Sequence, residues 1–274
     1  MAGIRVENLT KEFGDTVALD DVSFEIPEGE FAVVLGTSGS GKSTLLRCVN
    51  GLTAPTDGQV TIQGETVTKP RNDVAMVFQQ HNIIDGMSAY SNALSGALGR
   101  TDFTTSVLRT HDRKDKLQAL DALETVGLLD EAEQRAARMS GGQQQRVGIA
   151  RALVQNPNII LADEPVASLD PGSAQTVMRY LREAAEERGL TAMISLHQVN
   201  LARQFGQRFI GLADGKLVFD GYRDDLTFDV IDKLYGGIDM EQFLSGKNGA
   251  DESGDSGSAS ATATGSEAKN GVTQ

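Results

Sequence analysis

The 274-residue chain is acidic, with 38 Asp and Glu residues against 25 Lys and Arg residues, and its formal net charge is −13. This length allows one large buried core, and the negative charge excludes binding to nucleic acid through a broad basic surface. The single cysteine, Cys48, excludes an internal disulfide, and its apolar neighbours indicate a small buried residue rather than a reactive thiol.

The composition also bears on where the chain works. Carboxylates stay strongly hydrated when salt screens their charges, so the acidity fits a high-salt habitat and equally an ordinary acidic cytosolic protein. The N-terminus has no apolar signal core, and no apolar run in the sequence is long enough to cross a bilayer. We expect a cytoplasmic chain that meets a membrane only through a partner.

Short β-type runs separated by turns make up the first quarter of the chain. The runs cover residues 4–9, 17–26, 31–35 and 59–62, and the turns between them are rich in Pro and Gly. This pattern predicts a group of strands at the N-terminal end of the fold.

A phosphate-binding loop is predicted directly after the run at 31–35, where the sequence fits G-x-x-x-x-G-K-[ST]. Its glycines let successive N–H groups face phosphate oxygens, Lys42 reaches the β- and γ-phosphates, and the Ser43 hydroxyl can ligate Mg²⁺. A helix starting near Leu45 points its positive end at the same anion. A glycine-rich turn that binds nothing is the alternative, and the strand and helix around the loop argue against it. The loop residues are Gly36, Thr37, Ser38, Gly39, Ser40, Gly41, Lys42, Ser43 and Thr44.

The middle of the chain changes from strand to helix. Residues 74–78 are a buried strand by composition, whereas about 90–140 is rich in Leu and Ala with interspersed charges. The apolar residues that recur there at helical spacing are Leu117, Leu120, Leu123 and Val126. We predict a helical insert.

A second anion site is expected just before the amphipathic run at 147–153. Ser140 is placed to cap a helix, and two glycines after it expose backbone N–H groups. A nucleotide held at the first loop cannot also fill this site within a compact domain, so a second copy of the chain is the expected donor. Simple helix capping is the alternative. The residues of this site are Ser140, Gly141, Gly142 and Gln143.

Two carboxylates follow the strand predicted at 159–162. The C-terminal edge of a parallel sheet is where ligands of such sheets bind, and Asp163 and Glu164 stand there. We assign Asp163 to the Mg²⁺ shell and Glu164 to polarising the water that attacks a γ-phosphate. A solvated acidic pair at a strand end is the alternative.

Polar residues end two further strands at the same sheet edge. Gln79 follows the strand at 74–78 and is a candidate contact to Mg²⁺ or the attacking water, and His197 follows a strand at 191–196 and is a candidate donor to the γ-phosphate. Phe13 is a candidate face for stacking of adenine. Taken singly, a histidine and a phenylalanine in such places are more often ordinary surface or core residues.

The last third of the chain returns to alternating strands and helices. A helix at 174–188 lies between the strands at 159–162 and 191–196, and this order predicts a parallel core. Residues 209–212 and 216–219 predict a hairpin. Residues 247–274 are rich in Ser, Gly, Ala and Thr without aromatic residues, which predicts a disordered tail.

This ordered set of motifs resembles the ATP-binding subunit of ABC transporters over roughly residues 4–235. The corresponding segments are 36–44 for the Walker A loop, Gln79 for the Q-loop, 139–143 for the signature, 159–164 for Walker B, Asp170 for the D-loop and His197 for the switch histidine. The resemblance implies an α/β P-loop NTPase cassette over residues 1–246, with a parallel core sheet, an N-terminal antiparallel β subdomain and a helical insert at about 90–140. Met139 stands where the signature usually has Leu, a change of similar volume.

The resemblance also implies how such a chain works. Two copies pair head to tail and sandwich two ATP molecules with Mg²⁺, each between the loop of one copy and the signature of the other. Glu164 would be the catalytic base, Gln79 and His197 would assist it, and Phe13 and Asp170 would complete the nucleotide contacts. Closure on ATP would drive integral permease subunits at the cytoplasmic face of a membrane. From its own mixture of apolar and small residues, including Ile84 and Met87, we expect the segment 81–100 to form part of a groove for a cytoplasmic helix of the permease; ordinary core packing of the insert is the alternative.

Within the family, three segments look like the ATP-binding subunit of phosphonate importers. They are residues 91–100, 161–171 and 195–203, with Val166 and Ala167 in place of a more usual Thr-Ser or Thr-Ala. This implies uptake of a phosphonate or related phosphorus oxyanion, delivered by an extracytoplasmic solute-binding protein. The alternatives are an importer of another solute, a soluble ABC-type regulator acting on ribosomes or DNA, and a P-loop kinase. Co-purification with an integral membrane partner would favour the importer.

Overall fold

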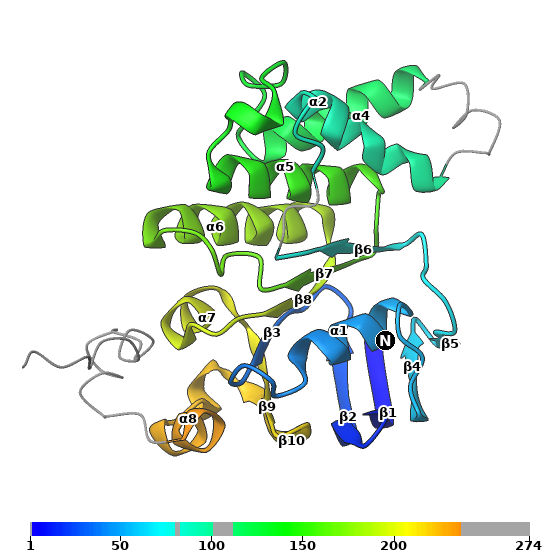
Figure 1. Ribbon diagram of the computed structural model, residues 1–274, viewed down its shortest axis with the longest axis vertical. Coiled ribbons are helices and arrows are strands. Elements are labelled where there is room, and N and C mark those ends of the chain that lie inside the picture. Colours follow the sequence, from blue (N-terminus) through cyan, green and yellow to red (C-terminus); the bar gives the residue numbers. More distant parts are fainter. Residues whose placement is uncertain (1, 80–82, 101–111, 237–274) are drawn as a thin grey trace, which may run out of the picture.

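The computed structural model of the chain describes residues 2–79, 83–100 and 112–236 (Figure 1). The boundary predicted after residue 246 and the tail predicted at 247–274 lie outside the described residues. Among the described helices, none combines the length and apolarity required to cross a bilayer.

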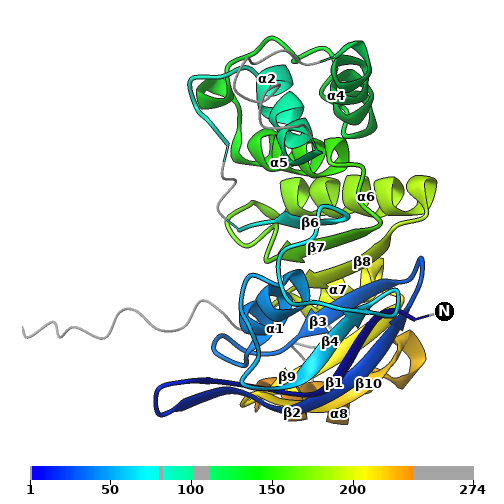
Figure 2. The ribbon, with the colours of Figure 1, turned by 90° about the vertical axis from the view of Figure 1, so that its right-hand side faces the viewer.

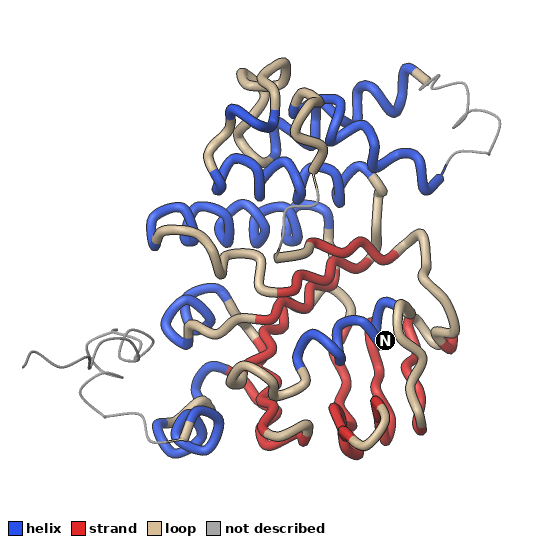
Figure 3. The backbone as a smooth tube through the Cα atoms, in the orientation of Figure 1, coloured by secondary structure: helices blue, strands red, loops and turns tan. Residues whose placement is uncertain are grey.

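A six-stranded sheet forms the centre of the fold (Figure 3). Five neighbouring strands are parallel, and the edge strand is antiparallel to its neighbour, which confirms both the parallel core and the hairpin expected from the sequence. In spatial order the strands are β10 (Lys216–Tyr222), β9 (Arg208–Ala213), β3 (Phe31–Leu35), β8 (Thr191–Ser195), β7 (Ile159–Asp163) and β6 (Val74–Val77). The parallel strands β3, β8, β7 and β6 are buried along their whole length because structure covers both faces of the sheet.

A smaller antiparallel sheet packs with helix α1 (Lys42–Asn50) against one face of the larger sheet (Figure 2). Its register places Ile4 between Ile26 and Ile62, so that apolar residues of three strands share one buried face. The strand order is β2 (Thr16–Pro27), β1 (Ala2–Phe13), β4 (Asp57–Ile62) and β5 (Glu65–Thr66). Cys48 lies in α1 and is buried in this core, as its neighbours in the sequence indicate.

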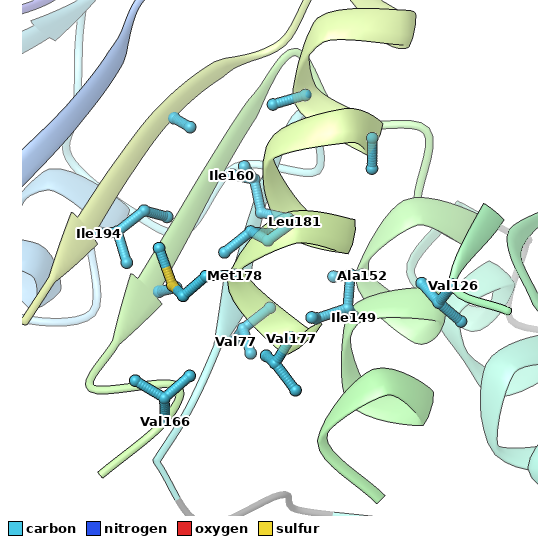
Figure 4. Close-up of a cluster of buried hydrophobic side chains, with 14 of the residues drawn as sticks. Val77, Val126, Ile149, Ala152, Ile160, Val166, Val177, Met178, Leu181 and Ile194 are labelled. Atoms are coloured by element: carbon cyan, nitrogen blue, oxygen red, sulfur yellow. The ribbon is translucent and has the colours of Figure 1, made fainter. Parts of the chain in front are cut away.

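Helices cover the opposite face of the larger sheet (Figure 1). Helix α6 (Pro171–Arg188) lies next to the sheet, α5 (Gly141–Val154) packs on α6 and β6, and α2 (Ala89–Leu94) and α4 (Arg113–Thr125) pack on α5, with 3-10 turns at Ser95–Arg100 and Ala136–Arg138. Side chains of β6, β7 and β8 meet α6, and α6 in turn meets α5 (Figure 4). The predicted helical insert is confirmed, and its core is continuous with that of the sheet.

The helix predicted from the apolar spacing is confirmed as α4, but the spaced apolar residues do not all lie on its buried face. Leu117 is 56% exposed and Leu120 is also exposed, whereas Leu123 and Val126 are buried. The buried face instead includes Ala119 and Ala122, because small side chains allow α4 to approach the helices beneath it closely. The three-residue spacing of the apolar residues from Leu117 to Val126 predicted a helix without identifying the face that packs.

Two short helices were not expected from the sequence. They are α7 (Val199–Phe205) after β8, and α8 (Phe228–Tyr235), which follows β10 and a 3-10 turn at Arg223–Asp225. Helix α8 packs against β9 through Leu234 and Ile231, both buried in the core beneath the helical face. Helix α7 contacts β3, and α8 contacts β9 and β10, so these two helices cover this part of the sheet.

Candidate active site

The loop after β3 depends on two glycines at positions where a larger residue does not fit. Gly36 has φ +147°, and an added Cβ would lie 2.2 Å from the Leu212 carbonyl oxygen. Gly41 has φ +102° and begins α1, and its Cβ would lie 2.6 Å from the Ala18 carbonyl oxygen. Because β9 and β2 lie against the loop, only glycine fits at these two positions, and the loop leads directly into the N-terminus of α1, where helix N–H groups can face a bound anion.

Lys42 is the first residue of α1, and its side chain folds back over the loop. Its Nζ donates to the carbonyl oxygens of Gly36 at 2.8 Å and Thr37 at 2.7 Å, and lies 3.5 Å from His197 Nδ1. Burial lowers the pKa of Lys42, and the Glu164 and Asp163 carboxylates act in the opposite direction. The ammonium is therefore held at the loop by acceptors that a phosphate group can replace.

Ser43 connects the loop to the end of β7. Its hydroxyl donates to Asp163 Oδ1 at 2.9 Å, and the same carboxylate oxygen accepts from Ser195 Oγ, also at 2.9 Å. Asp163 and Ser195 are opposite each other in the parallel pairing of β7 with β8. The two hydroxyls fix the orientation of the Asp163 carboxylate next to the first turn of α1.

Glu164 directly follows β7 with a left-handed backbone, φ +48°. Its Oε1 is 3.9 Å from Lys42 Nζ and in close contact with His197 Nε2. A lysine ammonium can only donate, so His197 accepts through Nδ1 and carries its proton on Nε2, facing Glu164. The histidine therefore bridges the lysine and the glutamate at the sheet edge where the sequence placed all three.

The donor set fits Mg²⁺ better than a transition metal. Ser43 Oγ and Asp163 Oδ1 are hard oxygen ligands in contact with each other, and the described residues contain no cluster of three His, Cys, Asp or Glu side chains. Mg²⁺ is commonly held by one or two protein oxygens together with phosphate oxygens and water. Gln79 follows β6 after Phe78, and its side chain is exposed at the same edge of the sheet.

The second predicted anion site lies at the start of α5. Ser140 caps the helix by a reciprocal pair of bonds: its Oγ accepts from Gln143 N at 3.3 Å, and its own N–H donates to Gln143 Oε1 at 2.9 Å. This confirms the predicted cap. Gly142 packs against Ser173 of α6, and an added Cβ there would lie 3.1 Å from the serine Cβ.

Asp170 belongs to this second surface and not to the loop. Its Oδ1 caps α6 by accepting from Gly172 N at 3.1 Å and Ser173 N at 3.0 Å, and the hydrogen bond to Ser173 lowers the pKa of the carboxyl. Ser140, Gln143 and Asp170 line one open cavity of about 370 Å³. One copy of the chain thus brings Lys42, Ser43, Asp163, Glu164 and His197 together and keeps the signature surface apart from them.

Phe13 ends β1 at the tip of the β1–β2 hairpin (Figure 2). The side chain is 54% exposed, so it is not a core residue, and Lys11 Nζ lies 4.9 Å from the ring centroid. The exposed ring is therefore available for stacking.

The sequence analysis missed two residues that contact the site. Ser195 ends the buried strand β8, where a polar residue after an apolar run at the ligand edge of a sheet is a usable signal. Tyr235 ends α8, and its hydroxyl accepts the Gly36 N–H at 3.3 Å. Burial raises the pKa of Tyr235 to about 12. No local pattern indicated that contact, because it joins residues 199 positions apart.

Comparison with known proteins shows which family has this site. A family model described as "ABC transporter" matches residues 19–167, more than half of the chain. The chain belongs to the ABC transporter family. The resemblance seen in the sequence motifs is thereby confirmed, and the cassette is a nucleotide-binding one.

Relatives within the ABC transporter family are similar over most of the chain. One, named "Phosphonates import ATP-binding protein PhnC", from Halobacterium salinarum, is 66% identical over 246 residues and covers 90% of this chain and 88% of the relative. Another, "Phosphonates import ATP-binding protein PhnC 2" from Haloquadratum walsbyi, is 58% identical and covers 87% and 85%. A solved dimeric ATP-binding cassette in a post-hydrolysis state, bound to ADP and Pi, is 35% identical with a TM-score of 0.68, covering 80% and 98%. The predicted fold class is confirmed by these structures.

Proposed function

We propose that this chain is the ATP-hydrolysing subunit of an ABC importer for a phosphonate or a related phosphorus oxyanion. The observation that carries the substrate class is the 66% identity over 90% of the chain to a protein named for phosphonate import. The hydrolytic part rests on the contacts among Lys42, Ser43, Asp163, Glu164 and His197.

Each of these residues has a distinct role in the proposal. Lys42 exchanges its loop carbonyls for the β- and γ-phosphate oxygens of ATP, and Glu164 accepts a proton from the attacking water. His197 orients the Glu164 carboxylate and offers a donor toward the γ-phosphate. Ser43 and Asp163, with Gln79 nearby, would hold Mg²⁺, which supplies charge neutralisation on the phosphates.

The active unit in this proposal is a pair of chains at the cytoplasmic face of a membrane. Ser140, Gln143 and Asp170 line a cavity at the N-terminus of α5, apart from the loop of their own copy; in the proposal this surface serves the nucleotide of the partner. The permease would be met by the exposed side of residues 83–98, where Ile84 is exposed and Leu94 is buried in the core. A solute-binding protein outside the membrane would deliver the ligand.

Growth with a phosphonate as sole phosphorus source tests the proposed function. In the source organism, deletion of the gene should abolish growth on methylphosphonate and uptake of the radiolabelled compound. The parent gene should restore both, whereas Glu164→Gln should restore neither because its product cannot take the proton of the attacking water.

Growth of the same strains on inorganic phosphate is the control. Deletion that impairs growth on both phosphorus sources would point away from import and toward a general cellular role, such as a soluble ABC-type regulator. Unchanged phosphonate uptake in the deletion strain would assign the subunit to another solute, and absence of ATP hydrolysis by the purified parent chain with Mg²⁺ would contradict the catalytic part.

A further inference from the structure

A buried hydroxyl joins the two adjacent acidic residues of the site. Ser195 Oγ donates to Asp163 Oδ1 at 2.9 Å and accepts the backbone N–H of Glu164 at 2.8 Å. The side chain is 0% exposed. Both bonds are short, and the Ser195 side chain contacts neither the loop nor Lys42 in the bonds that it makes.

The direction of these two bonds is fixed by chemistry. A backbone N–H can only donate and an ionised carboxylate can only accept, so the Ser195 hydroxyl proton must point at Asp163. The result is a chain of donors running from the Glu164 amide through Ser195 to Asp163. A hydroxyl is the smallest side-chain group that accepts from one of these partners while donating to the other.

The bond to Glu164 falls where the backbone needs support. Glu164 has φ +48°, a backbone conformation that residues other than glycine adopt infrequently. The direction in which the Glu164 side chain points depends on the orientation of the peptide group before it, because the turn begins there. The remaining residues of β8 from Thr191 to Ile194 are held by the sheet, so the strand presents Ser195 at a fixed height opposite Asp163.

We propose that Ser195 is a positioning residue for ATP hydrolysis, which fixes the orientation of the Glu164 peptide relative to the Asp163 carboxylate. This inference rests on the proposed function of the site. Ser195 acts through Glu164 and Asp163, so its loss should slow the chemical step and spare nucleotide binding by the loop.

The test compares Ser195→Ala with Thr191→Val in the purified full-length chain. Thr191 is a matched control: it lies on the same strand, is 3% exposed, and its hydroxyl accepts a backbone N–H, that of Gly29, at 3.0 Å. Both substitutions remove one buried hydroxyl that accepts from the backbone, but only Ser195 adjoins the carboxylates. Steady-state hydrolysis, affinity for a fluorescent ATP analogue and thermal unfolding are measured for each.

For Ser195→Ala we expect kcat to fall about 10- to 100-fold, as small displacements of reacting groups do, with KM and analogue affinity within about twofold. Thr191→Val should match the parent in kcat while losing thermal stability. Ser195→Thr, which keeps the hydroxyl, should recover most of the kcat. If Ser195→Ala does not fold, Ser195→Cys, of similar size but a weak donor, is expected to show the same loss of kcat alone.

Two results would overturn the inference. One is a kcat within about twofold of the parent for the folded Ser195 variant, and the other is a parallel fall of kcat and analogue affinity, as a general structural defect produces. If the parent and Thr191→Val hydrolyse ATP in the same assay, either of these results contradicts the role of Ser195 and leaves the proposed function intact. If the parent itself hydrolyses no ATP, the proposed function fails and the inference fails with it.

Discussion

At the scale of single residues, the site places its positive charge where water hardly reaches. Lys42 is 3% exposed and surrounded by two loop carbonyls, His197 and the Glu164 carboxylate. An isolated buried ammonium is costly, so these acceptors are what keep it charged in the absence of nucleotide. A bound phosphate would then take the place of the carbonyl groups as acceptor, and the lysine would not have to move in from solvent.

Lys42→Ala should therefore weaken ATP binding by about 10- to 100-fold, because a hydrogen bond to a charged group is worth about 1.5–3 kcal/mol. Fluorescence titration with an ATP analogue under conditions where the chain is monomeric measures this. Lys116→Ala, at an exposed position of α4, is the control and should bind as the parent does. Equal affinity in the two variants would contradict the assignment of Lys42 to the phosphates.

Cys48 provides a prediction about pH. Burial in α1 raises the pKa of its thiol to about 11, with Lys11 acting in the opposite direction. At pH 8 the folded chain then has roughly 100-fold less thiolate than an ordinary cysteine, and the thiolate is the reactive form. We expect alkylation to be slow below pH 9 and fast after unfolding in denaturant. Rapid labelling of the folded chain at pH 8 would show that the α1 core opens.

At the scale of elements, function depends on how helices and strands end. Helix α1 begins at the phosphate loop, α5 begins at the capped Ser140, and α6 begins at Asp170. Strands β7 and β8 end at Asp163 and Ser195. Because helix N-termini and the C-terminal edges of parallel strands both collect unpaired polar groups, one fold presents such groups at two separate surfaces.

Ser140→Arg should separate these two surfaces. We expect ATP affinity of the monomer to stay at the parent value, while dimer-dependent hydrolysis falls about 100-fold or more because the side chain fills the signature surface and removes anion donors. Titration of the ATP analogue and steady-state hydrolysis are the two measurements. Ser140→Ala is the matched control: it removes the same cap, at a cost of about 1 kcal/mol, without adding bulk. Equal loss of hydrolysis in both variants would assign Ser140 to capping alone.

At the scale of the whole molecule, the phosphate loop and the signature surface lie apart within one copy of the chain. The loop residues and the signature residues occupy different parts of the structure, with β6, β7 and α6 between α1 and α5 (Figure 1). A related cassette was solved as a dimer with ADP and Pi. The net charge of −13 opposes pairing of two chains at low ionic strength, and salt screens that repulsion.

Glu164→Gln should form a stable dimer with ATP and Mg²⁺ because the amide keeps the shape of the carboxylate but cannot accept the proton of water. Hydrolysis should fall about 100-fold or more. Light scattering coupled to size-exclusion chromatography measures the fraction of dimer. If the acidic surface is adapted to high salt, this fraction should be larger at molar salt concentrations than at low salt. The double variant with Ser140→Arg is the control and should stay monomeric. A Glu164→Gln chain that remains monomeric with ATP at every salt concentration contradicts the sandwich.

The sequence by itself determined the features that are local. The phosphate loop, the cap at Ser140 and the order of strands follow from residues a few positions apart, where backbone geometry and hydrogen bonding permit few solutions. Asp163, Glu164 and His197 were placed at one edge because parallel strands end on the same side of a sheet. These motifs also identify the family, because their order along the chain is specific.

Only the tertiary structure decided which residues meet. Strand β8 lies between β3 and β7, so Ser195 reaches Asp163, and α8 brings Tyr235 to Gly36 across most of the chain. Leucine spacing in α4 indicated a helix, but the packed face is the one with Ala119 and Ala122. Periodicity reports the local conformation of a segment, whereas strand neighbours and buried faces are set by the packing of all segments together, which no window of sequence contains.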